Sequence, residues 1–282
     1  MELAVSFPSE ELGTDLNKIK DFVQGVEQLG YTQIHAGEHI IGADPERFPE
    51  HPFTINSVFH EPLILMTYLA AISQHLLLVP AVLILPMRQT VLAAKMAAEV
   101  DIFSGGRLRL GLGIGSNQYE YDIMGKDFHT RGKRFDEQIE LMRALWTNRV
   151  VTFEGQNDSV IAGGLNPMPI QQPIPIWIGG GGVDVAMKRI ARLADGWIVT
   201  GRLEGGAGPA IEKFKGYVKE YGRDISKIAI TARGNAGATP DEQRKSYQEW
   251  ESLGATVVVV ATGKGEPAQM LDNLRRYKEA VS

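Results

Sequence analysis

Glu38 and His39 stand next to each other at the end of a short apolar segment, Gln33–Ala36. An imidazole titrates near neutral pH, so it can act as a general acid or base. A carboxylate beside it can orient it or share in proton transfer. The pair therefore indicates acid–base chemistry, although a purely structural hydrogen-bonded pair would have the same sequence.

The same segment can also be read as a metal site, because His35, Glu38 and His39 fit the pattern H-x-x-E-H. That pattern binds zinc only when a helix brings both imidazoles to one face. Gly37 and the apolar run before it favour a strand. We therefore expect no metal here, and a metal-dependent hydrolase remains an alternative outside the main interpretation.

Two glycine-rich segments, Gly111–Gly115 and Gly179–Gly182, each follow an apolar run. The first differs from the dinucleotide fingerprint G-x-G-x-x-G, because its third glycine comes one residue early. It could bring a ligand close to the backbone or simply allow tight packing. Four consecutive glycines are entropically costly unless the backbone is used. Since a helix is expected to start at Val183, the second segment predicts a phosphate site, with positive φ at Gly180.

Composition excludes several classes of protein. The chain has 29 Lys plus Arg and 34 Asp plus Glu, a net charge of −5, which argues against nucleic-acid or anionic-membrane partners. The absence of Cys excludes disulfides, thiolate metal sites and a Cys nucleophile. No basic signal-peptide segment opens the sequence, and the longest apolar run is shorter than the roughly 20 residues of a membrane span. We expect a cytoplasmic location.

Short apolar segments alternate with amphipathic ones along the whole chain. Continuous apolar runs are typical of parallel strands buried on both faces. The strands are expected at Leu3–Phe7, Gln33–Ala36, Leu76–Leu85, Arg107–Ile114, Ile174–Ile178, Gly196–Thr200, Ile228–Ala232 and Thr256–Ala261. The helices are expected at Asp15–Gly30, Pro62–Ser73, Thr90–Phe103, Arg131–Trp146, Val183–Ala194, Pro209–Tyr221, Pro240–Leu253 and Pro267–Glu279.

This order predicts an α/β fold, a (β/α)8 TIM barrel in one domain over residues 1–282. A doubly wound sheet is the alternative. Two connections are unusually long. Residues 37–61 would lie at the carboxyl ends of the strands, where barrel active sites form, and residues 147–173 at the opposite end, with a short strand near 150–155.

Several motifs together resemble the bacterial luciferase-like monooxygenase family. The most specific runs from Phe103 through Ser104-Gly105-Gly106-Arg107 to Gly115, followed by Asn117, Glu120-Tyr121 and Arg131–Glu137. Further matches are Pro167–Gln171, Pro175–Gly180 and Ala194–Trp197. Similarity covers nearly the whole chain and is weakest after Gly201. The resemblance implies a luciferase-like barrel that uses reduced flavin (FMN) or the deazaflavin coenzyme F-420.

The resemblance also implies roles for individual residues. His39 matches a proton donor beside the cofactor ring and Glu38 a catalytic neighbour, although the family usually has Asp there. The bond Ala81–Val82 matches a cis peptide that bulges against the ring, here with Pro80 before it. Cofactor contacts are implied for Gly113, Gly115, Ser116, Gly179, Gly180 and Gly181, and a substrate contact at the mouth for Thr200. Because position 116 is Ser, an acid sometimes present there in relatives is lost.

The compact length and the run Ser116–Tyr121 look more like the F-420 branch, which exchanges a hydride with a small organic substrate. An FMN-dependent monooxygenase that inserts one oxygen atom is the alternative, and a catalytically inactive flavin-binding protein is another. The sequence does not identify the substrate. Relatives are commonly homodimers, so we expect one here.

Overall fold

The computed structural model describes all residues, 1–282, and its main sheet is a parallel barrel. All neighbouring strand pairs in this sheet are parallel. Their spatial order is β3-β2-β1-β11-β10-β9-β8-β5-β4. The strands are β1 (Glu2–Ser6), β2 (Gln33–Ala36), β3 (Leu77–Pro80), β4 (Leu83–Ile84), β5 (Leu110–Gly113), β8 (Ile176–Gly180), β9 (Gly196–Val199), β10 (Ala229–Asn235) and β11 (Val257–Ala261).

The barrel closes through a single interrupted strand. β3 and β4 divide the expected strand Leu76–Leu85 at the Ala81–Val82 peptide, which is cis. β4 pairs with β5, while Leu78 of β3 bridges to Leu108 just before β5. The two short strands therefore occupy one barrel position, and the sheet has the eight positions of the expected (β/α)8 barrel.

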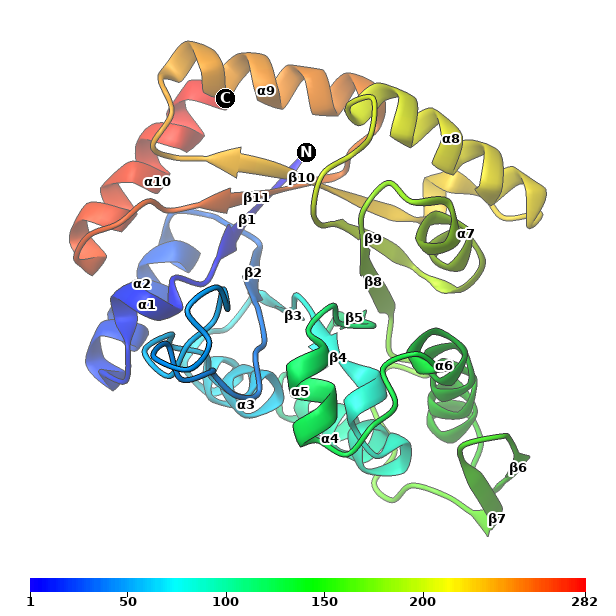
Figure 1. Ribbon diagram of the computed structural model, residues 1–282. Coiled ribbons are helices and arrows are strands. Elements are labelled where there is room, and N and C mark those ends of the chain that lie inside the picture. Colours follow the sequence, from blue (N-terminus) through cyan, green and yellow to red (C-terminus); the bar gives the residue numbers. More distant parts are fainter.

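An outer ring of helices surrounds the strands (Figure 1). They cover a core in which side chains on the outward faces of the strands, such as Val5, Ile34 and Leu78, are buried. The ring consists of α2 (Leu16–Gln28), α3 (Pro62–Ile72), α4 (Thr90–Phe103), α6 (Arg131–Thr147), α7 (Asp184–Leu193), α8 (Ala207–Glu220), α9 (Pro240–Leu253) and α10 (Pro267–Val281), all close to the expected ranges. The short elements α1 (Ser9–Leu12), α5 (Gln118–Ile123), η1 (Leu85–Met87) and η2 (Ile225–Lys227) were not expected from the sequence.

Inward-facing side chains fill the barrel axis. Ala4, Val79, Trp177, Ile198 and Val257 form a separate buried cluster there. Side chains alternate along each strand, so the next inward positions toward the carboxyl ends face the mouth of the barrel. This alternation decides which residues reach the functional site.

The two long connections differ. Residues 37–61 form no helix, and one bridge, Ala43 to Thr54, ties the segment to itself. Residues 147–173 carry an antiparallel hairpin, β6 (Val151–Glu154) and β7 (Ser159–Gly163), which lies outside α6 (Figure 1). The expected short strand is β6, and its partner was missed. No helix in the structure has the length and apolarity needed to span a bilayer.

Candidate active site

A cavity of about 520 Å³ opens at the carboxyl ends of β2, β4, β5, β8 and β9. This is the end of the barrel at which TIM-barrel enzymes carry their active sites. Every site residue expected from the sequence lines it: Glu38, His39, Ala81, Val82, Gly113, Gly115, Ser116, Gly179, Gly180, Gly181 and Thr200.

Val82 forms the inner wall of this cavity by projecting between two glycines. A Cβ atom at Gly179 would lie 2.6 Å from Val82 Cγ1, and one at Gly113 would overlap Val82 Cγ2. A side chain at Gly113 or Gly179 would push this wall into the cavity. The two glycines therefore let the cis segment sit deep in the barrel and leave a broad space in front of it.

The glycine segment after β8 differs in one respect from the expectation. None of Gly179–Gly182 has a positive φ, whereas Gly115 does, at 65°. The Cβ direction at Gly180 points toward Ile190 of α7, at 2.9 Å, and not into the cavity. A side chain at position 180 would meet the end of Ile190, and no left-handed backbone is present to favour glycine there.

The start of α7 lies at the edge of the same cavity. Val183 is the N-cap and supplies no side-chain hydrogen bond, and Val183 and Ala186 both line the space. Unpaired N–H groups at a helix N-terminus attract anions. The backbone here offers what a phosphate group of a cofactor needs.

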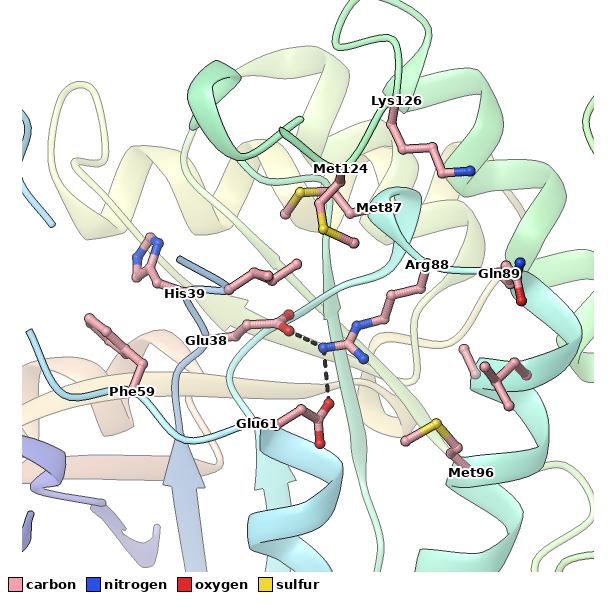
Figure 2. Close-up of a pocket in the computed structure, with 13 residues that line it drawn as sticks. Glu38, His39, Phe59, Glu61, Met87, Arg88, Gln89, Met96, Met124 and Lys126 are labelled. Atoms are coloured by element: carbon pink, nitrogen blue, oxygen red, sulfur yellow. Dashed lines mark hydrogen bonds and ion pairs between the residues drawn. The ribbon is translucent and has the colours of Figure 1, made fainter. Parts of the chain in front are cut away.

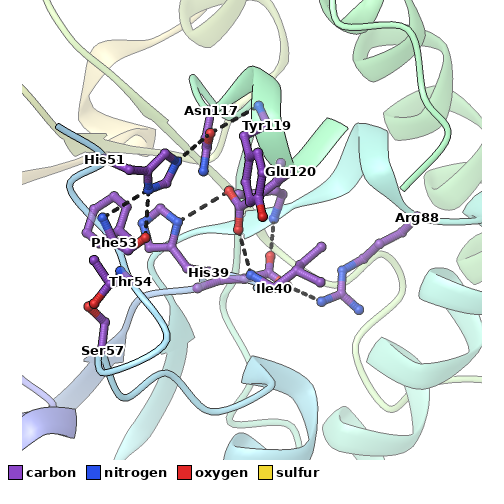
Figure 3. Close-up of polar contacts among 12 residues, drawn as sticks. His39, Ile40, His51, Phe53, Thr54, Ser57, Arg88, Asn117, Tyr119 and Glu120 are labelled. Carbon is purple, nitrogen blue, oxygen red and sulfur yellow. Dashed lines mark hydrogen bonds and ion pairs between the residues drawn. The ribbon is translucent and has the colours of Figure 1, made fainter. Parts of the chain in front are cut away.

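His39 is held by a buried carboxylate from α5. Its Nδ1 lies 3.3 Å from Oε2 of Glu120, whose Oε1 accepts a hydrogen bond of 2.7 Å from the Ile40 N–H (Figure 3). Glu120 is fully buried. Because an ionised carboxylate only accepts hydrogen bonds, Nδ1 carries a proton. Nε2 of His39 has no partner in the protein.

Burial raises the pKa of Glu120, but the hydrogen bonds from His39 and from the Ile40 N–H outweigh it, and the pKa is below its ordinary value. Glu120 is therefore ionised at neutral pH. The ionised carboxylate accepts the Nδ1 proton of His39 and leaves Nε2 as the free nitrogen of the ring.

Aromatic rings enclose the imidazole of His39. Phe53 stacks on it with ring centroids 3.5 Å apart, and Phe59 packs edge-on at 4.7 Å. Both come from the connection 37–61, which His51 ties to α5 through a 3.2 Å hydrogen bond between its Nε2 and Asn117 Oδ1 (Figure 3). The long loop thus limits the rotation of His39 and shields one side of it from water.

The side chain of Glu38 points away from His39, toward Ile84 and Arg88. Its buried carboxylate accepts a 2.5 Å hydrogen bond from the Ile84 N–H and pairs with Arg88, which also pairs with Glu61 at 2.9 Å (Figure 2). Burial raises the pKa of Glu38, and the charge of Arg88 only partly offsets this. These contacts join β2 to β4 and to the start of α3. A direct catalytic role for Glu38 stays a prediction.

The chain matches the family model described as luciferase-like monooxygenase over residues 1–280. This chain belongs to the luciferase-like monooxygenase family. An uncharacterized protein of Mycobacterium tuberculosis is 33% identical over 266 residues, covering 90% of this chain and 88% of that protein. An F-420-dependent glucose-6-phosphate dehydrogenase of Amycolatopsis mediterranei is 36% identical over 110 residues, covering 38% of this chain and 32% of the relative.

Solved structures share the luciferase-like barrel. A monooxygenase from Streptomyces bottropensis superposes with a TM-score of 0.82 at 16% identity, over 100% of this chain and 98% of that one. An F-420-dependent secondary alcohol dehydrogenase superposes with a TM-score of 0.80 at 14% identity, over 100% and 99%. Membership makes this chain an enzyme of the flavin- or deazaflavin-dependent oxidoreductase and monooxygenase type.

Arg131 is a site residue that the sequence did not single out. It lines the cavity, and its guanidinium lies over the Phe128 ring, 3.6 Å from the centroid. Nη1 donates to the Phe128 carbonyl oxygen at 2.6 Å, while the buried Nε has no hydrogen-bond partner. A buried N–H without a partner is unfavourable, so this group is suited to an anionic ligand.

The metal-hydrolase alternative finds no support in the geometry of its donors. His35, Glu38 and His39 lie along and after strand β2, and their side chains separate toward Gln33, Arg88 and Glu120 respectively. No group of three potential metal-ligating side chains is close enough to hold an ion.

Proposed function

We propose that this luciferase-like chain is a coenzyme F-420-dependent oxidoreductase that transfers a hydride to or from a small organic substrate. One observation carries the proposal: a single cavity joins a bulged wall at Val82, an uncapped helix start at Val183, and a histidine with a free Nε2. A flat ring, a phosphate and a proton-transfer group each have a place there.

The residues present fit such a cofactor. The buried Nε of Arg131 lacks a partner in the protein, and the backbone at Gly181 and α7 presents N–H groups to the same space. These groups would hold the phosphate-bearing arm. Val82 would support one face of the ring.

When bound, the deazaflavin supplies or accepts the hydride, and the protein handles the accompanying proton. In its protonated state, His39 donates from Nε2 to the substrate heteroatom that gains electrons. In its neutral state, the same nitrogen accepts a proton from a substrate hydroxyl that is being oxidised. Glu120 fixes the proton on Nδ1, so Nε2 stays aimed at the cavity in both cases.

F-420 is preferred over FMN because of the relative from Amycolatopsis and the run Ser116–Tyr121. An FMN-dependent monooxygenase is the second candidate, because the Streptomyces protein that shares the fold is a monooxygenase. The two differ in their need for oxygen. We expect turnover of reduced F-420 with a panel of carbonyl and enone acceptors under strictly anaerobic conditions. Activity only with reduced FMN and only in air would support the monooxygenase.

We also propose that the chain forms a homodimer through α3 and α4. A helix that is apolar all round is normally buried, yet these two adjacent helices expose Ile64, Leu92 and Phe103 to 65%, 53% and 62%. A second copy covering this face would remove that apolar area from water. Light scattering is expected to give twice the 31.0 kDa mass of one chain, and Leu92→Glu to shift the protein toward monomer.

A further inference from the structure

A second cavity, of about 270 Å³, lies in the mouth of the barrel directly beside the first. The two share Gly37, Ala81 and Thr200 as lining residues. A molecule in the smaller cavity would therefore lie next to the wall that Val82 forms and close to the strand end that carries His39.

The lining of this small cavity comes mostly from the carboxyl ends of β1, β2, β9, β10 and β11. Ser6, His35 and Thr231 contribute polar atoms, and small apolar residues such as Ala232, Val259 and Ala261 form most of the rest. The lining contains no Asp or Glu, although the chain as a whole has 34 acidic residues. Its one permanently charged residue is Arg233.

Arg233 is placed there by strand alternation. Gly234 faces Tyr277 of α10, on the outer side of β10, so its neighbour Arg233 faces the barrel mouth. Its Nε donates to the Val199 carbonyl oxygen at 3.3 Å. This is the only hydrogen bond of the guanidinium, which forms no ion pair, so most of its donors remain available.

Another arginine of the barrel shows the contrast. Arg107 donates five side-chain hydrogen bonds, two to Ser73 and one each to Ser104, Leu76 and Ala70, and so serves the fold. Arg233 has no comparable structural task. Arg233 is thus a cation without a protein partner at the rim of a cavity without acids, available to a negatively charged ligand.

We infer that the small cavity binds the substrate and that the substrate is a small organic acid, whose carboxylate pairs with Arg233. This inference rests on the proposed function. A planar guanidinium binds a carboxylate through two parallel hydrogen bonds. A single cation matches one negative charge, whereas a phosphate ester would bring nearly two. The carboxylate at Arg233 leaves the rest of the substrate directed toward Gly37 and the larger cavity.

The test is a calorimetric titration at pH 7 with two matched pairs of probes. Butyrate and crotonate carry the charge, while butyramide and crotonamide have the same shape without it. The wild-type protein is titrated with and without bound F-420. We expect the carboxylates to bind at least tenfold more tightly than the amides, and Arg233→Gln to abolish this preference.

Arg202→Gln is the matched control, because Arg202 is an exposed arginine of the same mouth that lines neither cavity and forms no ion pair. It is expected to keep the preference, and Arg233→Lys to keep part of it. The inference would be overturned if the wild-type protein bound acids and amides equally, bound no acid, or bound glycerol phosphate more tightly than the acids. It would also be overturned if the preference for acids survived in Arg233→Gln. Failure to bind any deazaflavin or flavin would instead refute the proposed function. The comparison of acids and amides without cofactor tests the carboxylate site on its own, so failure of the inference and failure of the proposed function can be told apart.

Discussion

His39 and Glu120 are 81 positions apart in the chain, yet His39 Nδ1 and Glu120 Oε2 lie 3.3 Å apart at the wall of the active-site cavity. The second oxygen of Glu120 holds the backbone N–H of Ile40 at 2.7 Å. One buried carboxylate thus fixes both the ring of His39 and the chain that follows it.

Replacing Glu120 by Gln is expected to separate its contact with the His39 ring from its contact with the Ile40 backbone. The amide oxygen can still accept from the Ile40 N–H, so the fold should persist, but the carboxylate that accepts the proton of His39 Nδ1 is lost. We expect kcat to fall about tenfold while KM for substrate and for cofactor changes less than about threefold, an effect of roughly 1.4 kcal/mol on the transition state. A rise in KM with unchanged kcat would mean that Glu120 serves binding alone.

His39→Ala removes the proposed proton-transfer group. General acid–base catalysis typically contributes about 10²–10⁴ in rate, so turnover should fall by such a factor while cofactor affinity stays close to wild type. His39→Gln is expected to retain part of the rate through hydrogen bonding. Turnover and melting temperature are measured on one preparation, and a lower melting temperature with an unchanged rate per folded molecule would show a structural His39.

Arg131→Met tests whether Arg131 binds the phosphate group of the cofactor. A charge-assisted hydrogen bond to a phosphate contributes roughly 1.5–3 kcal/mol, so the dissociation constant of the cofactor should rise by about 10- to 100-fold. Lys133→Met makes the same charge change in the first turn of α6, at a residue outside the cavity. Fluorescence titration should show less than about a twofold effect for this control. If both variants lost cofactor affinity equally, the contribution of Arg131 would be a general electrostatic effect and not a direct contact with the phosphate.

His35 predicts a pH dependence of stability. Complete burial lowers its pKa to about 3, against about 6.5 in an unfolded chain. The folded state therefore stays neutral while the unfolded state gains a proton, so stability is lost as pH falls from about 6.5 toward 3, at up to about 1.4 kcal/mol per pH unit. Urea unfolding at pH 7 and pH 5 should show a loss about 2 kcal/mol larger for wild type than for His35→Gln. Equal losses would contradict a buried neutral His35.

The barrel fold could be predicted from the sequence because its strands are continuous apolar runs and its helices carry clear apolar faces. The expected strand Thr256–Ala261, for example, differs from β11 by one residue, and Ile174–Ile178 overlaps β8 but begins and ends two residues early. Pro80 alone indicated an irregular point in this strand, because proline cannot donate to the ladder, whereas the cis bond at Ala81–Val82 came from the family resemblance. The strand β7 was missed because Ser159–Gly163 is mostly exposed and has no apolar alternation.

Only some residues of the candidate site could be predicted from the sequence, for a physical reason. Residues at strand ends are brought together by the barrel itself, so the glycines and His39 could be located from their positions after apolar runs. Glu120 lies in α5, a helix too short to be foreseen, whereas Arg131 begins α6, which was expected; tertiary packing brings both residues to the cavity. The backbone at Gly180 was misjudged because a glycine that packs close to Ile190 looks the same in sequence as one required for positive φ.

An anaerobic equilibrium titration of the purified protein with coenzyme F-420 and, separately, with FMN tests the proposed cofactor most directly. We predict that F-420 binds at least about tenfold more tightly, a difference of roughly 1.4 kcal/mol. Tighter binding of FMN, or FMN retained by the protein through purification, would contradict the assignment to F-420.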